Sequence, residues 1–206
     1  MVRQDLCAMK VGTDGVLLGA WTRVEGTGSI LDVGSGTGLV ALMLAQRCDA
    51  SIDAIDIDEG AFRQTRQNFE QSPFAERLCV YHSSLQGFEP NRQYDLIVSN
   101  PPYFSQSLLS PDSGRSLARH DCSLSLEELI ACSSGLLSPC GRLSLILPFD
   151  QYQRVLETAS EYRLSETRKT VVYPTPSSLP KRILLEFSRI AQPTATDELV
   201  IEETRH

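Results

Sequence analysis

Short apolar runs recur along the chain, separated by turn residues or by amphipathic segments. The runs are rich in β-branched residues, which is typical of buried strands. Several of the intervening segments have the apolar spacing of helices. This alternation predicts an α/β domain with a mostly parallel sheet. The predicted strands are 29–33, 51–57, 78–81, 94–98, 141–147, 167–173 and 182–187, and the predicted helices are 16–21, 39–47, 59–71, 125–137 and 152–162.

The pattern contains no internal repeat and no linker, so we expect one domain over residues 1–190. Residues 191–206 are polar and predict a loosely held tail. A turn-like stretch precedes the first predicted helix, and Thr13 or Asp14 is a candidate N-cap for it.

The composition narrows the class of protein. Of the 206 residues, 41 % are hydrophobic and 22 % are charged, as in ordinary globular proteins. No run is long enough to span a membrane, and the N-terminus has no signal-peptide pattern. The six scattered cysteines include no C-x-x-C pair, which favours reduced thiols in the cytoplasm and neither a metal site nor a disulfide framework. A net charge of −7 argues against nucleic-acid binding by bulk charge, so an RNA partner requires a local basic patch.

A glycine loop follows the first predicted strand and precedes a helix. Asp32 is directly followed by Val33 and by three glycines at alternate positions, Gly34, Gly36 and Gly38. A dinucleotide-binding loop has Gly-x-Gly-x-x-Gly, and Leu39 stands where its third glycine would fall. The loop therefore suits a nucleoside that carries an amino acid better than one that carries a pyrophosphate, with Asp32 facing the ammonium group. Tight backbone packing alone is the alternative interpretation of these glycines.

Acidic and polar residues follow the next two strands. Asp56 falls near the end of the second strand, where an acid can reach ribose hydroxyls. Asp58, together with Glu59, is better explained as the charged N-terminus of the next helix. His82 and Ser84 follow the third strand, where an adenine ring would be bound, and we interpret His82 as an ordinary polar residue at a strand end.

The fourth strand leads into Asn100-Pro101-Pro102-Tyr103. The two prolines cannot continue the sheet and stiffen the backbone at the carboxyl end of a parallel strand, where α/β sheets bind ligands. The Asn100 amide oxygen and the Pro101 carbonyl can accept both hydrogens of one NH2 group, and Tyr103 can stack on the ring that carries it. These contacts would favour a pyramidal nitrogen whose lone pair can attack, without a strong base. A merely rigid loop is the alternative.

A long polar stretch, 105–121, follows this corner and has the length of a lid or binding loop, although a solvated loop is equally compatible. The candidates for contacts with RNA phosphates are Arg115, Arg119, Lys181 and Arg182.

Several motifs, taken in order, resemble those of the class I S-adenosylmethionine-dependent methyltransferases that act on amino groups. They are DVGSGTG at 32–38, Asp56 and NPPY at 100–103. Further segments, at 10–21, 41–47, 71–77 and 179–185, resemble the bacterial tRNA1(Val) adenine-N6 methyltransferases over nearly the whole chain. The resemblance implies a Rossmann-like seven-stranded sheet with the last strand antiparallel, a cytoplasmic location, S-adenosylmethionine as methyl donor, and the adenine at position 37, beside the anticodon of valine tRNA, as substrate.

The resemblance also implies roles for individual residues. The donor would be held by Thr13, Asp14, Asp32, Gly34, Gly36, Gly38, Asp56 and Ser84, with residues 1–28 closing over it. The amine would be oriented by Asn100 and Pro101, and the adenine would contact Pro102 and Tyr103. Ser84 stands where the family usually has an acid, and Lys181 stands where it has a histidine. Neither a metal ion nor a protein partner is implied.

The corner at Asn100 does not by itself name the substrate. Methyltransferases that act on a protein glutamine or on guanine N2 of ribosomal RNA use similar corners, so these activities stay open. A non-catalytic RNA-binding module of the same fold is a further alternative, and binding of a labelled donor would separate it from an enzyme.

Overall fold

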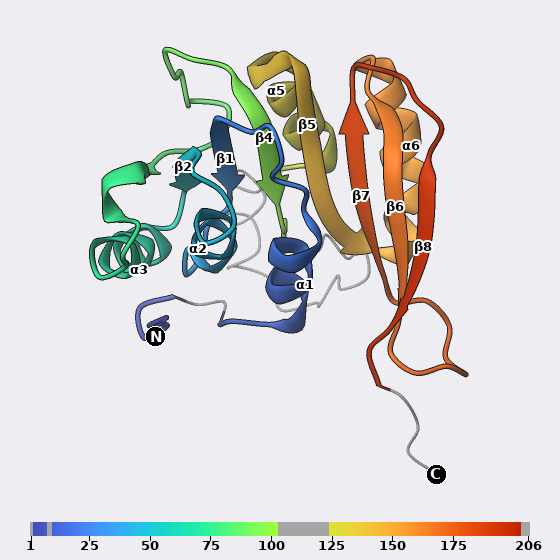
Figure 1. Ribbon diagram of the computed structural model, residues 1–206, viewed down its shortest axis with the longest axis horizontal. Helices are drawn as coiled ribbons and strands as arrows, with labels where there is room; N and C mark the ends of the chain where they lie inside the picture. Colours follow the sequence, from blue (N-terminus) through green and yellow to red (C-terminus); the bar gives the residue numbers. More distant parts are fainter. Residues whose placement is uncertain (1, 8–9, 103–123, 203–206) are drawn as a thin grey trace, which may run out of the picture.

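A single twisted sheet forms the centre of the protein. The computed structural model describes residues 2–7, 10–102 and 124–202, and within them eight strands pair in the order β3-β2-β1-β4-β5-β7-β6-β8 (Figure 1). The strands are β1 (Ser29–Val33), β2 (Ser51–Asp56), β3 (Leu78–His82), β4 (Tyr94–Ser99), β5 (Leu137–Pro148), β6 (Ser165–Tyr173), β7 (Arg182–Ser188) and β8 (Ala195–Val200).

The directions of the strands agree with the sequence-based expectation for the first seven. Strands β1 to β5 pair in parallel, whereas β7 is antiparallel to both β5 and β6. The expected count of seven strands is corrected to eight, because β8 pairs in parallel with β6 inside the segment expected to be a loose tail. All six residues of β8 are exposed, so its order comes from backbone pairing at the sheet edge and leaves no apolar pattern in the sequence.

Helices cover both faces of the sheet. Alternation along each strand sends Ile30 of β1 into a core cluster with α1 to α3, and its neighbour Leu31 into a second cluster with α5 and α6. The helices are α1 (Thr13–Trp21), α2 (Leu39–Ala45), α3 (Glu59–Glu70), α5 (Leu126–Leu136) and α6 (Tyr152–Glu161), with short 3-10 turns at Ala75–Arg77 and Phe149–Gln151.

The helix starts show which capping predictions hold. Asp58 caps α3 by accepting a hydrogen bond from the Ala61 N–H at 2.8 Å, as its sequence position indicated. The N-cap of α1 is instead Gly12, and Thr13 and Asp14 form the first turn. The prediction of an N-cap at Thr13 or Asp14 is therefore wrong: Asp14 has its carboxylate 2.9 Å from the Arg182 guanidinium, in an ion pair that the local sequence does not reveal.

The C-terminal end of helix α1 is anchored to strand β6. The Trp21 indole N–H donates to the Thr170 hydroxyl at 2.8 Å, and the Arg168 guanidinium lies 4.3 Å from the centre of the Trp21 ring. Arg168 also donates to the Trp21 carbonyl at 2.9 Å. These contacts fix the position of α1 against β6, and with it the first turn of the helix at the carboxyl edge of the sheet.

Two general features bear on the class of protein. In the part of the chain that the structure describes, no helix has both the length and the apolar character needed to cross a membrane. The cysteines in that part, Cys7, Cys48, Cys79, Cys132 and Cys140, are free thiols.

Gly38 is a position where replacement should be unusually costly. Its φ is +75°, and a Cβ there would lie 2.9 Å from the Phe69 ring. Gly26 has a similar φ of +71° but no heavy atom within 4 Å of that point. We expect Gly26→Ala to lower the free energy of unfolding by about 1–2 kcal/mol through backbone strain alone, and Gly38→Ala to lower it by a further ~1–3 kcal/mol through overpacking.

Urea denaturation of both variants beside the wild type measures the two effects. Equal losses for Gly26→Ala and Gly38→Ala would contradict the steric contribution at Gly38.

Candidate active site

The register of the central strands brings separate parts of the sequence to one edge. Val33, the last residue of β1, lies opposite both Ile55 of β2 and Ser99 of β4. The segments that follow these three parallel strands therefore leave the sheet side by side. The glycine loop, Asp56 and Asn100 come directly after Val33, Ile55 and Ser99, so the pairing brings them to the same place.

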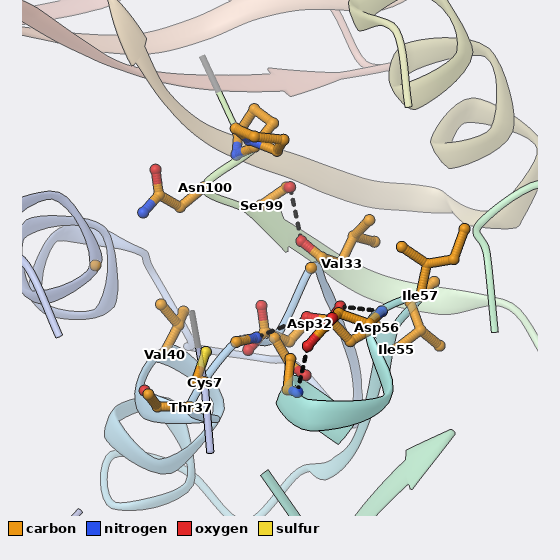
Figure 2. Close-up of a pocket in the computed structure, with 18 of the residues that line it drawn as sticks. Cys7, Asp32, Val33, Thr37, Val40, Ile55, Asp56, Ile57, Ser99 and Asn100 are labelled. Carbon is orange, nitrogen blue, oxygen red and sulfur yellow. Dashed lines mark hydrogen bonds between the residues drawn. The ribbon is translucent and has the colours of Figure 1, made fainter. Parts of the chain in front are cut away.

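A cavity of about 390 Å³ lies at this edge, a volume within the range of small-molecule sites. It brings together eight of the residues that the sequence predicted for donor or amine binding, namely Asp32, Gly34, Gly36, Asp56, Ser84, Asn100, Pro101 and Pro102. Figure 2 shows Asp32, Asp56 and Asn100 around the same space, each from a different strand end.

The glycine loop leaves room for a ligand where a side chain would fill it. Gly34 has a φ of +76°, and a Cβ built on it would meet no atom within 4 Å. The N–H groups of Gly34 and Ser35 donate to the Ile55 carbonyl at 2.9 and 3.1 Å, which fixes the loop to the end of β2. Glycine is required at position 34 for the left-handed backbone, and the open space above it belongs to the cavity.

Polar residues on the inner face of α3 hold the other side of the loop. The Thr65 hydroxyl donates to the Gly36 carbonyl at 3.0 Å, and the Asn68 amide donates to the Thr37 carbonyl at 2.8 Å. Both side chains are buried. The sequence analysis did not identify these residues, although polar side chains on the face of an amphipathic helix that should be apolar are a usable signal.

The N-terminal segment is fastened to the same face of α3. Asn68 accepts a hydrogen bond from the Arg3 N–H and donates to the Arg3 carbonyl, both at 2.8 Å. Gln64 accepts one from the Leu6 N–H at 2.8 Å. This attachment brings Cys7 to the cavity wall, with its Sγ 3.8 Å from where a Cβ of Gly36 would lie. The segment therefore forms part of the cavity wall, a contribution the sequence analysis assigned to no individual residue before position 13.

Asp32 is a buried carboxylate at the base of the cavity. Its side chain accepts a hydrogen bond from the Ala41 N–H at 3.2 Å, and the residue is only 2 % exposed. The pKa of Asp32 is raised to about 7, mainly by burial and in smaller part by the nearby Asp56 carboxylate, while the Ala41 N–H opposes the increase. A positive ligand group beside Asp32 would offset this cost of burying the charge.

Asp56 bridges two neighbouring segments at the cavity wall. Its carboxylate accepts hydrogen bonds at 2.9 Å from the Gly36 N–H and from the Asp58 N–H (Figure 2). Burial raises the pKa of Asp56, while these two N–H groups oppose the increase. The carboxylate thus ties the glycine loop to the end of β2 and presents an acceptor at the cavity.

The Asn100 corner is held in place by the residue before it. The buried Ser99 hydroxyl donates to the Val33 carbonyl at 2.8 Å, joining the ends of β4 and β1 (Figure 2). Pro101 is buried and Pro102 is exposed. Because neither proline has an N–H, Pro101 and Pro102 cannot extend the hydrogen bonding of β4, and both line the cavity. Tyr103, the fourth residue of the motif, lies outside the described residues.

Ser84 takes part in a turn next to the cavity. Its hydroxyl accepts a hydrogen bond from the Gly87 N–H at 3.2 Å, and its carbonyl accepts one from the Ser83 hydroxyl at 2.9 Å. His82 stacks on Phe62 and its ring nitrogen lies 3.0 Å from the Ile57 carbonyl, in line with the interpretation of a polar strand-end residue.

Several predicted residues lie elsewhere than in the cavity wall. Gly38 is the N-cap of α2 and does not line the cavity. Near the start of α1 the cavity is lined by Gly12 and Gly15 and not by the predicted Thr13 and Asp14. Asp14 instead pairs with Arg182. Lys181 is exposed next to that pair. Arg115 and Arg119 lie outside the described residues. Within residues 2–7, 10–102 and 124–202, no group of three or more histidine, cysteine or acidic side chains could hold a metal ion.

Comparisons with known proteins agree with this arrangement. The family model of the methyltransferase small domain matches residues 11–171. A protein of Parabacteroides distasonis is 52 % identical over 209 residues, covering the whole of this chain and 88 % of the relative, and is named tRNA1(Val) (adenine(37)-N6)-methyltransferase. Relatives with the same name in Flavobacterium psychrophilum and Bacteroides fragilis are 49 % and 47 % identical, again over the whole of this chain and over 89 % and 88 % of the relatives.

Solved structures share the fold at much lower identity. A predicted O-methyltransferase from Agrobacterium tumefaciens has a TM-score of 0.72 and 19 % identity, covering 93 % of this chain and 89 % of that one. The glycopeptide N-methyltransferase MtfA, solved with S-adenosyl-L-methionine, has a TM-score of 0.60 and 10 % identity, covering 85 % of this chain and 92 % of that one. The fold is that of class I methyltransferases, and the chain belongs to the methyltransferase small domain family, among relatives named tRNA1(Val) (adenine(37)-N6)-methyltransferases.

Proposed function

We propose that this protein transfers a methyl group from S-adenosylmethionine to N6 of adenine 37, next to the anticodon of valine tRNA. The observation that carries the proposal is a single cavity that joins the Asn100–Pro101 corner to a glycine loop flanked by a buried acid, Asp32, and a half-buried acid, Asp56. Relatives about half identical over the whole chain carry the name of this activity.

The residues of the cavity fit such a methyl donor. The open space above Gly34 accepts a ligand close to the backbone, and buried Asp32 supplies a negative charge for an ammonium group. Asp56 presents carboxylate oxygens that can accept hydrogen bonds from ribose hydroxyls, and Ser84 stands where the adenine would be bound. When bound, S-adenosylmethionine supplies an electrophilic methyl group on a sulfonium.

The corner provides what the nucleophile requires. The lone pair of an adenine amine is delocalised into the ring, so the amine attacks poorly while it stays planar. The Asn100 amide oxygen and the Pro101 carbonyl accept its two hydrogens and favour the pyramidal form. After methyl transfer the nitrogen loses one of these hydrogens as a proton to solvent, so no strong base is needed. The described residues of the corner are held rigidly by Ser99 and the two prolines.

Transfer of labelled methyl groups to tRNA that lacks the modification tests the function, followed by mapping of the modified nucleoside. We expect label at N6 of adenine 37 in valine tRNA. Label in ribosomal RNA or in protein glutamine would support the other amino methyltransferases with similar corners. Absence of donor binding would support a non-catalytic module.

Replacement of Asn100 tests the corner. Asn100→Ala should lower kcat by about a hundredfold or more, because it removes an oriented acceptor that stabilises the amine as it becomes pyramidal in the transition state. The Kd for the donor should change little. Asn100→Asp, which keeps an acceptor oxygen, should retain more activity than Asn100→Ala, and Asn91→Ala serves as a control on an exposed loop. Near-normal turnover of Asn100→Ala would remove Asn100 from the mechanism.

The raised pKa of Asp32 predicts proton-linked donor binding. Only the carboxylate pairs with an ammonium group, so below pH 7 binding must first remove the proton from Asp32. We expect donor Kd to fall about tenfold between pH 5.5 and 6.5, and calorimetry in two buffers at pH 6 to detect the release of about one proton. Asp32→Asn should abolish the release, whereas Asp49→Asn, at an exposed position, should not.

The same pKa sets the sign for folding in the absence of donor. Folding raises the pKa of Asp32 from 3.8 to about 7, so the folded state binds its proton more tightly than the unfolded state does. The resulting stabilisation is fully present below pH 3.8 and is lost as the pH rises through about 7. Asp32→Asn should therefore raise Tm at pH 8 while weakening donor binding. Donor binding by the wild type at pH 6 without proton release would contradict the role of Asp32.

Lys181 offers a test of the RNA surface. The side chain is exposed beside the Asp14–Arg182 pair. If Lys181 contacts a phosphate, Lys181→Ala should weaken tRNA binding and reduce the slope of log K against log salt by about one. Arg163→Ala is the control, because Arg163 is an exposed cation just before β6, at the opposite edge of the sheet. An unchanged slope in Lys181→Ala would exclude this phosphate contact.

A further inference from the structure

The loop between β6 and β7 carries a large apolar side chain that no core contact explains. Leu179 is 83 % exposed, whereas the next most exposed large hydrophobic residue in the described part of the chain, Ile190, is 54 % exposed. A single exposed leucine is ordinary on a protein surface. The setting of Leu179 distinguishes it, because the loop is stiff, carries no acid and lies at the same edge of the sheet as the cavity.

The loop is built to hold its shape. The Thr175 N–H donates to the Ser178 hydroxyl at 3.0 Å, and this hydroxyl donates to the Thr175 carbonyl at 2.8 Å. The Ser178 N–H also donates to that carbonyl, at 3.1 Å. The loop sequence, PTPSSLPK at 174–181, contains three prolines that restrict the backbone further. An element ordered in advance loses little conformational entropy when it binds.

Strand register puts the loop at the edge that holds the cavity. Arg182, which starts β7, lies opposite Pro148 at the end of β5, and Ser99 lies opposite Leu145 of the same strand. The loop before Arg182 therefore projects beyond the carboxyl ends of the parallel strands, as Figure 1 shows between β6 and β7. Two strand spacings separate β7 from β4, which is about 10 Å.

The base of the loop is also joined to the cavity wall. Arg182 pairs with Asp14 at 2.9 Å, and Gly12 and Gly15 on either side of Asp14 line the cavity. The Lys181 N–H donates to the Val172 carbonyl at 3.0 Å, and the Lys181 carbonyl accepts from the Phe149 N–H at 3.2 Å. The tip and the cavity are thus parts of one rigid framework.

We propose that Leu179 is a wedge that contacts the RNA bases flanking the target adenine and stabilises the unstacked state from which this adenine enters the cavity. The inference rests on the proposed function, which requires a base to leave its stack at a cost of a few kcal/mol. Apolar side chains inserted at a base step lower such a cost. An RNA strand lying across this edge of the sheet, with about 3.4 Å for each stacked nucleotide, spans the ~10 Å between β4 and β7 with about three nucleotides. Lys181, at the base of the loop, adds a positive charge for the backbone of the same strand.

Fluorescence of 2-aminopurine tests the wedge without relying on turnover. Stem-loops of valine tRNA carry this base at each of the two positions on either side of the target adenine in turn, and S-adenosylhomocysteine replaces the donor. The wild type should raise the fluorescence at one or more positions, because unstacking relieves quenching. Leu179→Ala should lose this increase, whereas Ile190→Ala, at the opposite edge of the sheet, should retain it.

Kinetics with the reactive donor complete the test. Leu179→Ala should lower kcat/KM on the intact stem-loop about tenfold and should be close to the wild type on a stem-loop with an abasic site beside the adenine, where no stack has to be broken. The wedge would be overturned if Leu179→Ala raised the fluorescence as much as the wild type does, or if neither protein raised it. It would also be overturned if Leu179→Ala lost the same factor in kcat/KM on both RNAs. Those results would also be expected if Leu179 instead bound a protein. A wild type that unstacks the RNA but does not methylate it would refute the proposed function and leave the wedge standing.

Discussion

The parallel pairing of β1 with β2 on one side and β4 on the other is the constraint on which the site depends. This pairing puts Val33 opposite both Ile55 and Ser99, so three chain segments leave the sheet at one level. The glycine loop bonds to the Ile55 carbonyl, and the Ser99 hydroxyl bonds to the Val33 carbonyl. A shift of the register by one residue would reverse which side chains face the core and would separate the two halves of the cavity.

The cavity also shows how binding can conflict with stability. Asp32 is almost fully buried, and its carboxylate has one hydrogen bond from the backbone of α2 and the charge of Asp56 nearby. Burying a charge in this way is unfavourable until an opposite charge arrives. In the proposed function the ammonium group of the donor supplies that charge, so the ligand-free protein retains an unfavourable interaction that binding relieves.

Helix α3 connects these features to the N-terminus. Its buried face carries Gln64, Thr65 and Asn68 in place of apolar residues, and all three make hydrogen bonds to the backbone of the glycine loop or of the N-terminal segment. Each bond satisfies a polar group away from water, which makes the geometry of the loop specific. The first turn of α1 plays a similar part at the other side of the cavity, where Asp14 joins it to β7.

Elements of the fold whose signals lie within a few residues could be read from the amino-acid sequence. The strands β1 to β7, from their apolar and β-branched runs, and the helices of both faces could be predicted. So could the cap at Asp58 and the joint placement of Asp32, Gly34, Asp56 and Asn100 at strand ends, because hydrophobic patterns and glycine or proline chemistry act over a few residues. The folded protein was needed to reveal the pairing of β8 with β6, the N-cap at Gly12, the Asp14–Arg182 ion pair and the polar contacts of α3. Those features depend on residues that lie far apart in the chain, and the free energy of a hydrogen bond or ion pair between them is fixed only when the fold has brought them together.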